Sequence, residues 1–115
     1  MPKGDALYVG YMLDMARKAL QLVEGKDRVA FDQDETLRLA LVHLIQVIGE
    51  AARGISHEIR KANPHIPWKL IIGMRNRIVH DYTVFDDDVV WDTVSNELEP
   101  LVAALERFTP LEESF

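Results

Sequence analysis

The chain has 115 residues, about half of them apolar and none of them cysteine, and a net charge of −6. This length and apolar share suit one domain over residues 1–115, and the lack of cysteine excludes a disulfide framework, a thiolate zinc site and a cysteine nucleophile. No apolar run approaches the ~20 residues of a membrane span, and two aspartates interrupt the first twenty residues, so we expect a cytoplasmic protein without signal peptide or membrane contact.

Apolar residues at helical spacing predict two long helices in the first half of the chain. The first runs from roughly Asp5 to Val23, and Gly25 follows its end. The second runs from roughly Asp34 to Arg53, where acids at its start and Gly54 after its end are typical helix boundaries. Its apolar stripe recurs at i, i+4, i+7 and i+11 and consists of Leu37, Leu41, Leu44 and Ile48.

The second half predicts a short helix and two longer ones. The short helix spans Ser56 to Ala62, and two prolines then interrupt the chain. A helix from Pro67 to Tyr82 is apolar on more than one face, so we expect the core and a second subunit to cover it. The last helix runs from roughly Asp87 to Phe108, and Pro100 should kink or split it.

Alternating patterns typical of strands are absent from the chain. The helical segments therefore predict an all-α fold, an up-and-down bundle of four main helices plus a short connecting helix.

Positive charge is concentrated in one segment of this acidic chain. Residues 53–80 contain six lysines or arginines against a single acid, Glu58, whereas the other residues contain seven basic and eighteen acidic side chains. The segment therefore predicts a local positive surface that suits a phosphate-bearing partner. The alternative is that these cations pair with acids elsewhere in the fold. The six are Arg53, Arg60, Lys61, Lys69, Arg75 and Arg77.

Other candidate sites are weaker. His57 and His65 are eight residues apart across a probable loop, which does not favour a shared metal ion, and His43 lies inside an apolar stripe, where a histidine is usually packed. Three aspartates at positions 86–88 suit the start of a helix, where acids cap the chain and complement the helix dipole. A glycine-rich phosphate loop and a helical pair of zinc-binding histidines are absent, so we expect no metal and no cofactor.

The stretch "RNRIVHDY", residues 75–82, holds the most concentrated set of candidate site residues. On a regular helix Arg75 and His80 lie roughly 140° apart, so they do not share one face. Either the helix ends near His80 and its side chain swings back, or the site is built from two subunits across a two-fold axis. Asn76 precedes His80 by four residues and is placed to orient the imidazole if the helix continues.

Arginine and histidine together suit the cleavage of RNA. Imidazole, with an ordinary pKa of roughly 6.5, can take the proton of a 2′-hydroxyl or give one to a leaving 5′-oxygen. Guanidinium binds phosphate through paired hydrogen bonds and stabilises the charge of the transition state. No metal is needed when the substrate supplies its own nucleophile. The alternative is a surface arginine and a histidine that caps a helix C-terminus.

Residues 46–82, "QVIGEAARGISHEIRKANPHIPWKLIIGMRNRIVHDY", resemble the signature of the HepT branch of the HEPN superfamily. The matching features are "IGEA" at residues 48–51, "P-x-IPW" at 64–68, "IIGMRN" at 71–76 and "R-x4-H-x-Y" at 75–82. The segment "VVWDTVSNELEPL" resembles the last long helix of that family, with its proline. The likeness therefore extends over nearly the whole chain.

The resemblance implies a homodimer that acts as a metal-independent endoribonuclease, the toxin of a toxin–antitoxin pair. It implies that Arg75 and His80 are catalytic and that Asn76 and Arg77 support them. Its partner would be an MntA-type nucleotidyltransferase antitoxin that transfers AMP to Tyr82 and so blocks substrate phosphate. The alternative is a non-catalytic HEPN subunit that dimerises, docks on a nucleotidyltransferase and helps to bind nucleotide. The intact set of motif residues favours the ribonuclease.

Overall fold

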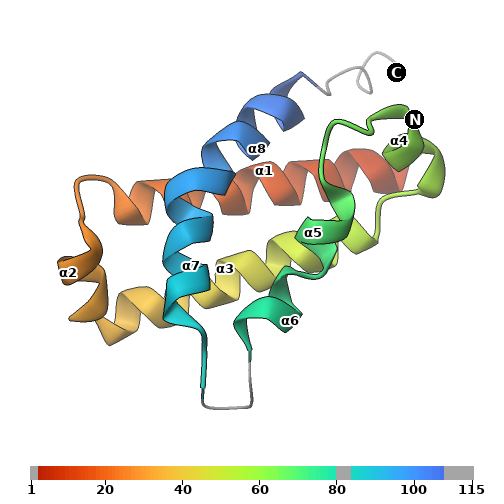
Figure 1. Cartoon of the computed structure of the whole chain (residues 1–115). Helices are drawn as coiled ribbons and strands as arrows, with labels where there is room; N and C mark the ends of the chain where they lie inside the picture. The colour runs from red at the N-terminus through yellow and green to blue at the C-terminus, as the bar shows by residue number, and fades with distance from the viewer. Residues whose placement is uncertain (1–2, 80–83, 108–115) are drawn as a thin grey trace.

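The computed structural model describes residues 3–79 and 84–107 and is all-helical within them, apart from one isolated bridge between two residues (Figure 1). The all-α fold predicted from the periodicity is therefore confirmed. Its helices, with a π-helical turn called η1, are α1 (Lys3–Val23), α2 (Arg28–Asp32), α3 (Glu35–Arg53), α4 (His57–Ala62), α5 (Trp68–Ile72), α6 (Met74–Ile78), α7 (Asp87–Asp92), η1 (Thr93–Glu97) and α8 (Leu98–Glu106).

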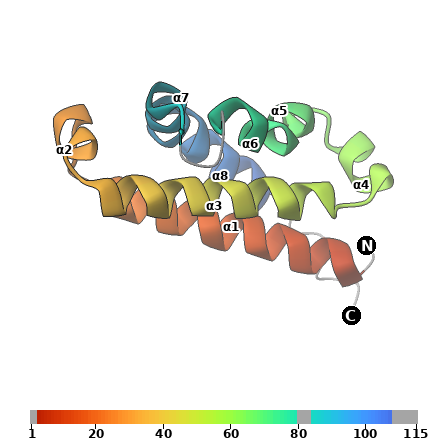
Figure 2. The same ribbon diagram turned by 90° about the horizontal axis from the view of Figure 1, so that it is seen from below.

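The two long helices, α1 and α3, run antiparallel and side by side as the base of the molecule (Figures 1 and 2). The shorter helices cover this pair from one side: α5 and α6 pack on α3, and α8 packs on α1. Helix α3 is the centre of the core, because Leu41, Ile45 and Ile48 on it have no exposed surface. Each such side chain contributes about 1.5–3 kcal/mol relative to full exposure. Among the described residues, no helix is long and apolar enough to cross a membrane.

Side-chain caps set the start of α3 and α4 where the sequence predicted them. Asp34 accepts a hydrogen bond from the backbone of Leu37 at 3.0 Å, and Ser56 accepts one from Ile59 at 3.4 Å. Helix α2 was not predicted, because five residues are too few to show a period. Its Asp27 cap accepts from Ala30 at 2.9 Å.

The helix predicted from Pro67 to Tyr82 is the main correction to the fold. The structure has two short helices, α5 and α6, which meet at Gly73, and α6 ends at Ile78. Val79 is extended and forms an antiparallel bridge with Phe85, and Asp86 donates its backbone N–H to the carbonyl of Ile78 at 2.7 Å. A contact from outside the helix therefore takes the carbonyl that another helical turn would use.

The predicted split of the last helix at Pro100 is confirmed. Proline has no N–H to donate to the carbonyl four residues earlier, so it is tolerated only near a helix start. Pro100 is the third residue of α8, and the π-helical turn η1 lies just before that helix. The N–H of Leu98 bonds to the carbonyl of Thr93, five residues earlier. The wider turn lets the chain restart as an α-helix ahead of the proline.

Candidate functional site

Helix α6 carries the candidate arginine on a firmly held backbone. Met74 and Ile78 are 2% and 0% exposed and anchor the helix in the core, whereas Arg75 and Asn76 are exposed. Helix α3 approaches the preceding helix α5 closely, since a side-chain carbon on Gly49 would lie 3.1 Å from the carbonyl oxygen of Ile71. The buried face fixes the helix, and the guanidinium of Arg75 is left in solvent.

His80 and Tyr82 lie outside the described residues. The residues on either side of that segment are described: Val79 bridges Phe85, and Ile78 accepts from Asp86. Both attachment points of residues 80–83 therefore lie beside the last turn of α6. Because α6 ends two residues before His80, the angle of roughly 140° from a continuous helix does not apply to this pair. The helix therefore ends before His80, and the argument for a two-subunit site from that angle is lost. Whether Arg75 and His80 meet within one chain or across two subunits stays a prediction.

Two other expectations that assumed a continuous helix or stripe also change. Asn76 and His80 are not stacked four residues apart on one helix, because α6 does not reach His80. His43 is exposed on α3 rather than packed, so the sequence prediction for it was wrong. The neighbouring Val42 and Leu44 are the buried side chains in this turn of α3.

Arg77, predicted as a supporting residue, has a partner that the sequence did not reveal. Its Nη2 atom lies 3.7 Å from Oε2 of Glu97, and both side chains are 36% exposed. An ion pair this exposed contributes about 0–1 kcal/mol to stability. The pair joins α6 to the π-helical turn η1, which lies directly before α8.

Cations outside residues 53–80 form ion pairs far more often than those inside. Within that segment, among the described residues, only Arg77 makes an ion pair with a carboxylate, and Arg60 donates to the carbonyl of Ile55 at 3.1 Å. In the part of the chain that the structure describes, the positive segment is therefore largely unpaired, which disfavours the alternative that its cations pair with acids elsewhere in the fold. The pairs outside it are Arg17–Glu106, Lys18–Asp14, Arg28–Asp32, Arg28–Asp88 and Arg38–Asp87.

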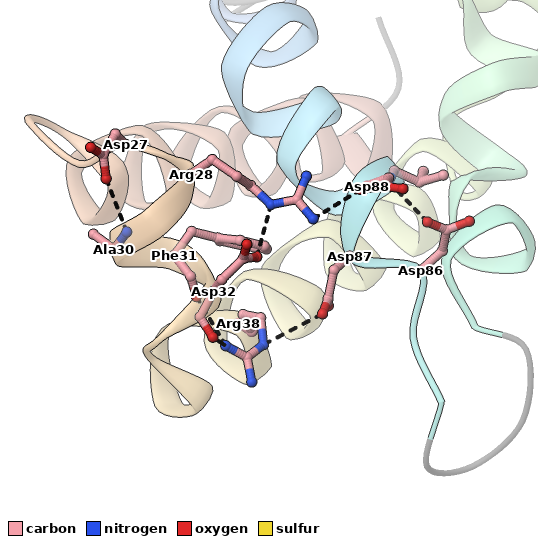
Figure 3. Close-up of polar contacts among 10 residues, drawn as sticks. Asp27, Arg28, Ala30, Phe31, Asp32, Arg38, Asp86, Asp87 and Asp88 are labelled. Carbon is pink, nitrogen blue, oxygen red and sulfur yellow. Dashed lines mark hydrogen bonds and ion pairs between the residues drawn. The ribbon is translucent and has the colours of Figure 1, made fainter.

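The three aspartates at positions 86–88 act as a helix start and as partners for arginines (Figure 3). Asp86 caps α7 by accepting from Val89 at 3.2 Å, as the sequence predicted. Asp87 lies 3.7 Å from Arg38, and Asp88 lies 2.8 Å from Arg28. The carboxylates thus have three different partners instead of one common centre.

Arg28 links α2 to α7. Hydrogen bonds that the Arg28 guanidinium donates to Asp32 and then to Asp88 raise its pKa above the ordinary value. Beneath it, Phe31 is fully buried and its ring centroid lies 5.1 Å from that of Trp91. Aromatic packing and exposed ion pairs therefore hold α7 at the point where it leaves the candidate site.

Comparison with known proteins gives consistent matches. The family model described as "Ribonuclease HepT-like" matches residues 12–108. "Putative RNase MJ0125" of Methanocaldococcus jannaschii is 32% identical over 112 residues, which cover 93% of this chain and 93% of that protein. "Probable ribonuclease HepT" of Thermococcus cleftensis is 30% identical over 101 residues, which cover 84% and 91%. No solved structure gives a significant match.

Proposed function

Because the chain belongs to the HepT-like ribonuclease family, we propose that it is the endoribonuclease toxin of a toxin–antitoxin pair and cuts RNA without a metal ion. The observation that carries this proposal is Arg75. It is exposed on a helix whose other face is buried, within a segment of positive charge that is largely unpaired among the described residues. A cation held in this way is suited to a phosphate.

Arg75 and His80 divide the chemistry of the cut. His80 takes the proton of the 2′-hydroxyl, and the 2′-oxygen attacks the adjacent phosphorus. The bond from phosphorus to the 5′-oxygen then breaks, that oxygen takes a proton from water, and His80 releases its own proton to the solvent. The products are a 2′,3′-cyclic phosphate and a 5′-hydroxyl. Arg75 binds the non-bridging oxygens and stabilises the charge that they gain in the transition state. Asn76 and Arg77 support this site.

Regulation would act on the same segment. In this proposal the chain forms a homodimer, and an MntA-type nucleotidyltransferase antitoxin transfers AMP to Tyr82. The adduct would exclude substrate by its bulk and by the repulsion between its phosphate and that of the RNA. Coexpression with the nucleotidyltransferase and a mass measurement test this step. Tyr82→Phe should lose the adduct, and an adduct of full mass on that variant would place the modification elsewhere.

The cleavage itself is tested with the purified chain, single-stranded RNA and three variants. Arg75→Ala should lower the cleavage rate by about 10²–10³-fold, the usual cost of one transition-state donor. His80→Ala should lower it by about 10²–10⁴-fold, the usual contribution of one acid or base. Arg53→Ala removes another exposed arginine of the same basic segment and should change the rate little.

The ends of the cleaved RNA can be checked in the same assay. A 2′,3′-cyclic phosphate end supports the proposed attack by the 2′-oxygen. A wild-type chain that neither cuts RNA nor slows growth when expressed alone would refute the toxin and would favour the non-catalytic subunit.

A further inference from the structure

A cavity of ≈ 250 Å³ lies between α5–α6 on one side and η1–α8 on the other. Its floor is apolar, because Ile71, Met74, Leu98 and Leu101 are all at most 6% exposed. Its rim is more polar and more open. The remaining lining residues are His65, Pro67, Asn96, Glu97, Pro100 and Ala104.

The size of the cavity suits one ring system. Pockets for drug-sized ligands measure about 300–1,000 Å³, and this one is slightly smaller. A protein partner would need a contact of about 800 Å² on each side, which is far more than one small cavity offers. An apolar floor with a few polar groups at the rim is the usual form of a small-molecule pocket.

Two side chains at the rim offer hydrogen-bond acceptors. The Nδ2 atom of Asn96 donates to Asp92 at 2.8 Å, which leaves the amide oxygen of Asn96 to accept. The carboxylate of Glu97 has about four acceptor positions, and its contact with Arg77 at 3.7 Å occupies one oxygen. Both residues belong to the π-helical turn, a feature that recurs at functional sites. Two acceptors above an apolar floor match a flat ring that carries N–H donors.

Arg77 reaches a residue at the rim of the same cavity. On α6 it lies three residues after Met74, so its direction differs from that of Met74 by about 60°. Met74 forms part of the floor, and Glu97 at the rim is the ion-pair partner of Arg77. Guanidinium has five donors, so one contact with Glu97 leaves donors for a phosphate oxygen. A ring pocket beside a cation is the arrangement that a nucleotide requires.

We infer that this cavity binds a nucleobase with an exocyclic amino group, while Arg77 holds the adjoining phosphate of a single-stranded RNA. The inference rests on the proposed function for its choice of RNA as the ligand. Asn96 and Glu97 accept hydrogen bonds from the amino group of adenine, cytosine or guanine, whereas uracil has a ring N–H but no amino group. The cavity is thus the specificity pocket of the ribonuclease, separate from the catalytic pair.

The test uses the full-length His80→Ala chain, so that binding is measured without cleavage. Short labelled oligo-A, oligo-C and oligo-U are titrated, and oligo-A and oligo-C should bind about tenfold more tightly than oligo-U. Ala104→Phe fills the cavity from its edge and should reduce that preference to near equality. Ala103→Phe on the exposed side of α8 is the matched control and should retain the preference. Glu97→Gln replaces one acceptor oxygen with a donor and should reduce the preference for oligo-A and oligo-C over oligo-U.

Equal binding of the three oligonucleotides, or an unchanged preference in both Ala104→Phe and Glu97→Gln, would overturn the inference. If the Ala104→Phe protein changes its molar mass in solution but keeps its base preference, the cavity belongs to a protein interface and the inference is also overturned. Tight binding of AMP without binding of oligo-A would assign the cavity to a free nucleotide and reject the RNA ligand. If the wild type fails to cut RNA while base preference still depends on Glu97 and Ala104, the proposed cleavage fails and the pocket stands.

Discussion

The backbone N–H of Asp86 donates to the carbonyl oxygen of Ile78 at 2.7 Å, which joins the start of α7 to the end of α6. The contact works together with the bridge between Val79 and Phe85. These four residues bring both ends of the segment that holds His80 next to the helix that carries Arg75. The stability of the α7 start is therefore tied to the geometry of the candidate site.

Removal of the α7 cap should weaken this junction. Asp86→Ala loses the side chain that accepts from Val89 at 3.2 Å, so the free energy of unfolding should fall by about 1 kcal/mol. Urea unfolding measures this change, and the melting temperature should fall by ~5 °C. Asp86→Asn still has a side-chain oxygen and should lose much less. Equal losses in the two variants would show that the charge of Asp86 matters more than its cap.

Two glycines of the long helices should respond to alanine in opposite directions. In Gly49→Ala the new carbon would lie 3.1 Å from the carbonyl oxygen of Ile71, so α3 and α5 must move apart. We expect this variant to lose about 1–3 kcal/mol in urea unfolding. Gly10 on α1 is exposed and has open space around it, so Gly10→Ala should gain about 0.5–1 kcal/mol from helix propensity. An unchanged or higher stability of Gly49→Ala would contradict the close approach at Gly49, and a loss in Gly10→Ala would contradict the open space around Gly10.

These examples show what the sequence could predict. The long helices α1 and α3 were predicted because their periods extend over several turns and their ends carry local signals such as Asp34. The end of α6 was missed because no proline or glycine marks Val79. The helix ends where Ile78 accepts a hydrogen bond from Asp86, eight residues further along the chain. Sequence spacing alone cannot reveal such a contact.

In the candidate site, too, the sequence predicts features that depend on neighbouring residues and misses those that depend on distant ones. The exposure of Arg75 agrees with the charge pattern of its own segment. The partner of Arg77 was not predictable in this way, because Glu97 lies twenty residues away on the π-helical turn η1. The position of His80 relative to Arg75 stays a prediction.

Arg38 should stabilise the fold more than an ordinary surface arginine. Its Nη1 atom donates to the carbonyls of Phe31 and Asp32 at the end of α2, and its side chain is 23% exposed. Arg38→Ala leaves those carbonyls without this donor, so unfolding should become easier by about 1–3 kcal/mol. Arg17→Ala is the control, because the Arg17–Glu106 pair is more than half exposed and should contribute about 0–1 kcal/mol. Similar losses from both variants would reject the special role of Arg38.

The contribution of Arg28 to the free energy of unfolding should depend on salt concentration, and it should not depend on pH in the neutral range. Its raised pKa means that the charged form is stabilised in the folded chain. This contribution is present below the ordinary pKa of arginine and is lost only as pH rises through the higher pKa of the folded state. Between pH 6 and 9, roughly, the difference between wild type and Arg28→Ala should therefore be constant. Added salt should reduce it, because both pairs of Arg28 are partly exposed. A difference that is unchanged in 1 M salt, roughly, would contradict a Coulombic origin.

Arg75 should contribute one phosphate contact to RNA binding. In the logarithmic dependence of affinity on salt, each contact with a single strand adds about 0.7 to the slope. Arg75→Ala should therefore bind oligo-A, oligo-C and oligo-U more weakly by similar factors and lower the slope by about that amount. Filter binding at several salt concentrations measures both quantities. A base-dependent loss would indicate that Arg75 contacts a base, and an unchanged slope would refute its contact with phosphate.

A mixture of two inactive chains decides whether the proposed site is shared between subunits. Because α6 ends at Ile78, helix geometry no longer favours either arrangement of Arg75 and His80. In a heterodimer of Arg75→Ala with His80→Ala, a shared site combines both intact residues once, so cleavage should recover to about half of the wild-type rate per dimer. If each subunit uses its own pair, one site lacks arginine and the other lacks histidine, and nothing recovers. Copurification on two different tags and an RNA cleavage assay give the answer. Homodimers of each variant, treated identically, supply the background rate, and only recovery above both of them supports a site built across the two-fold axis.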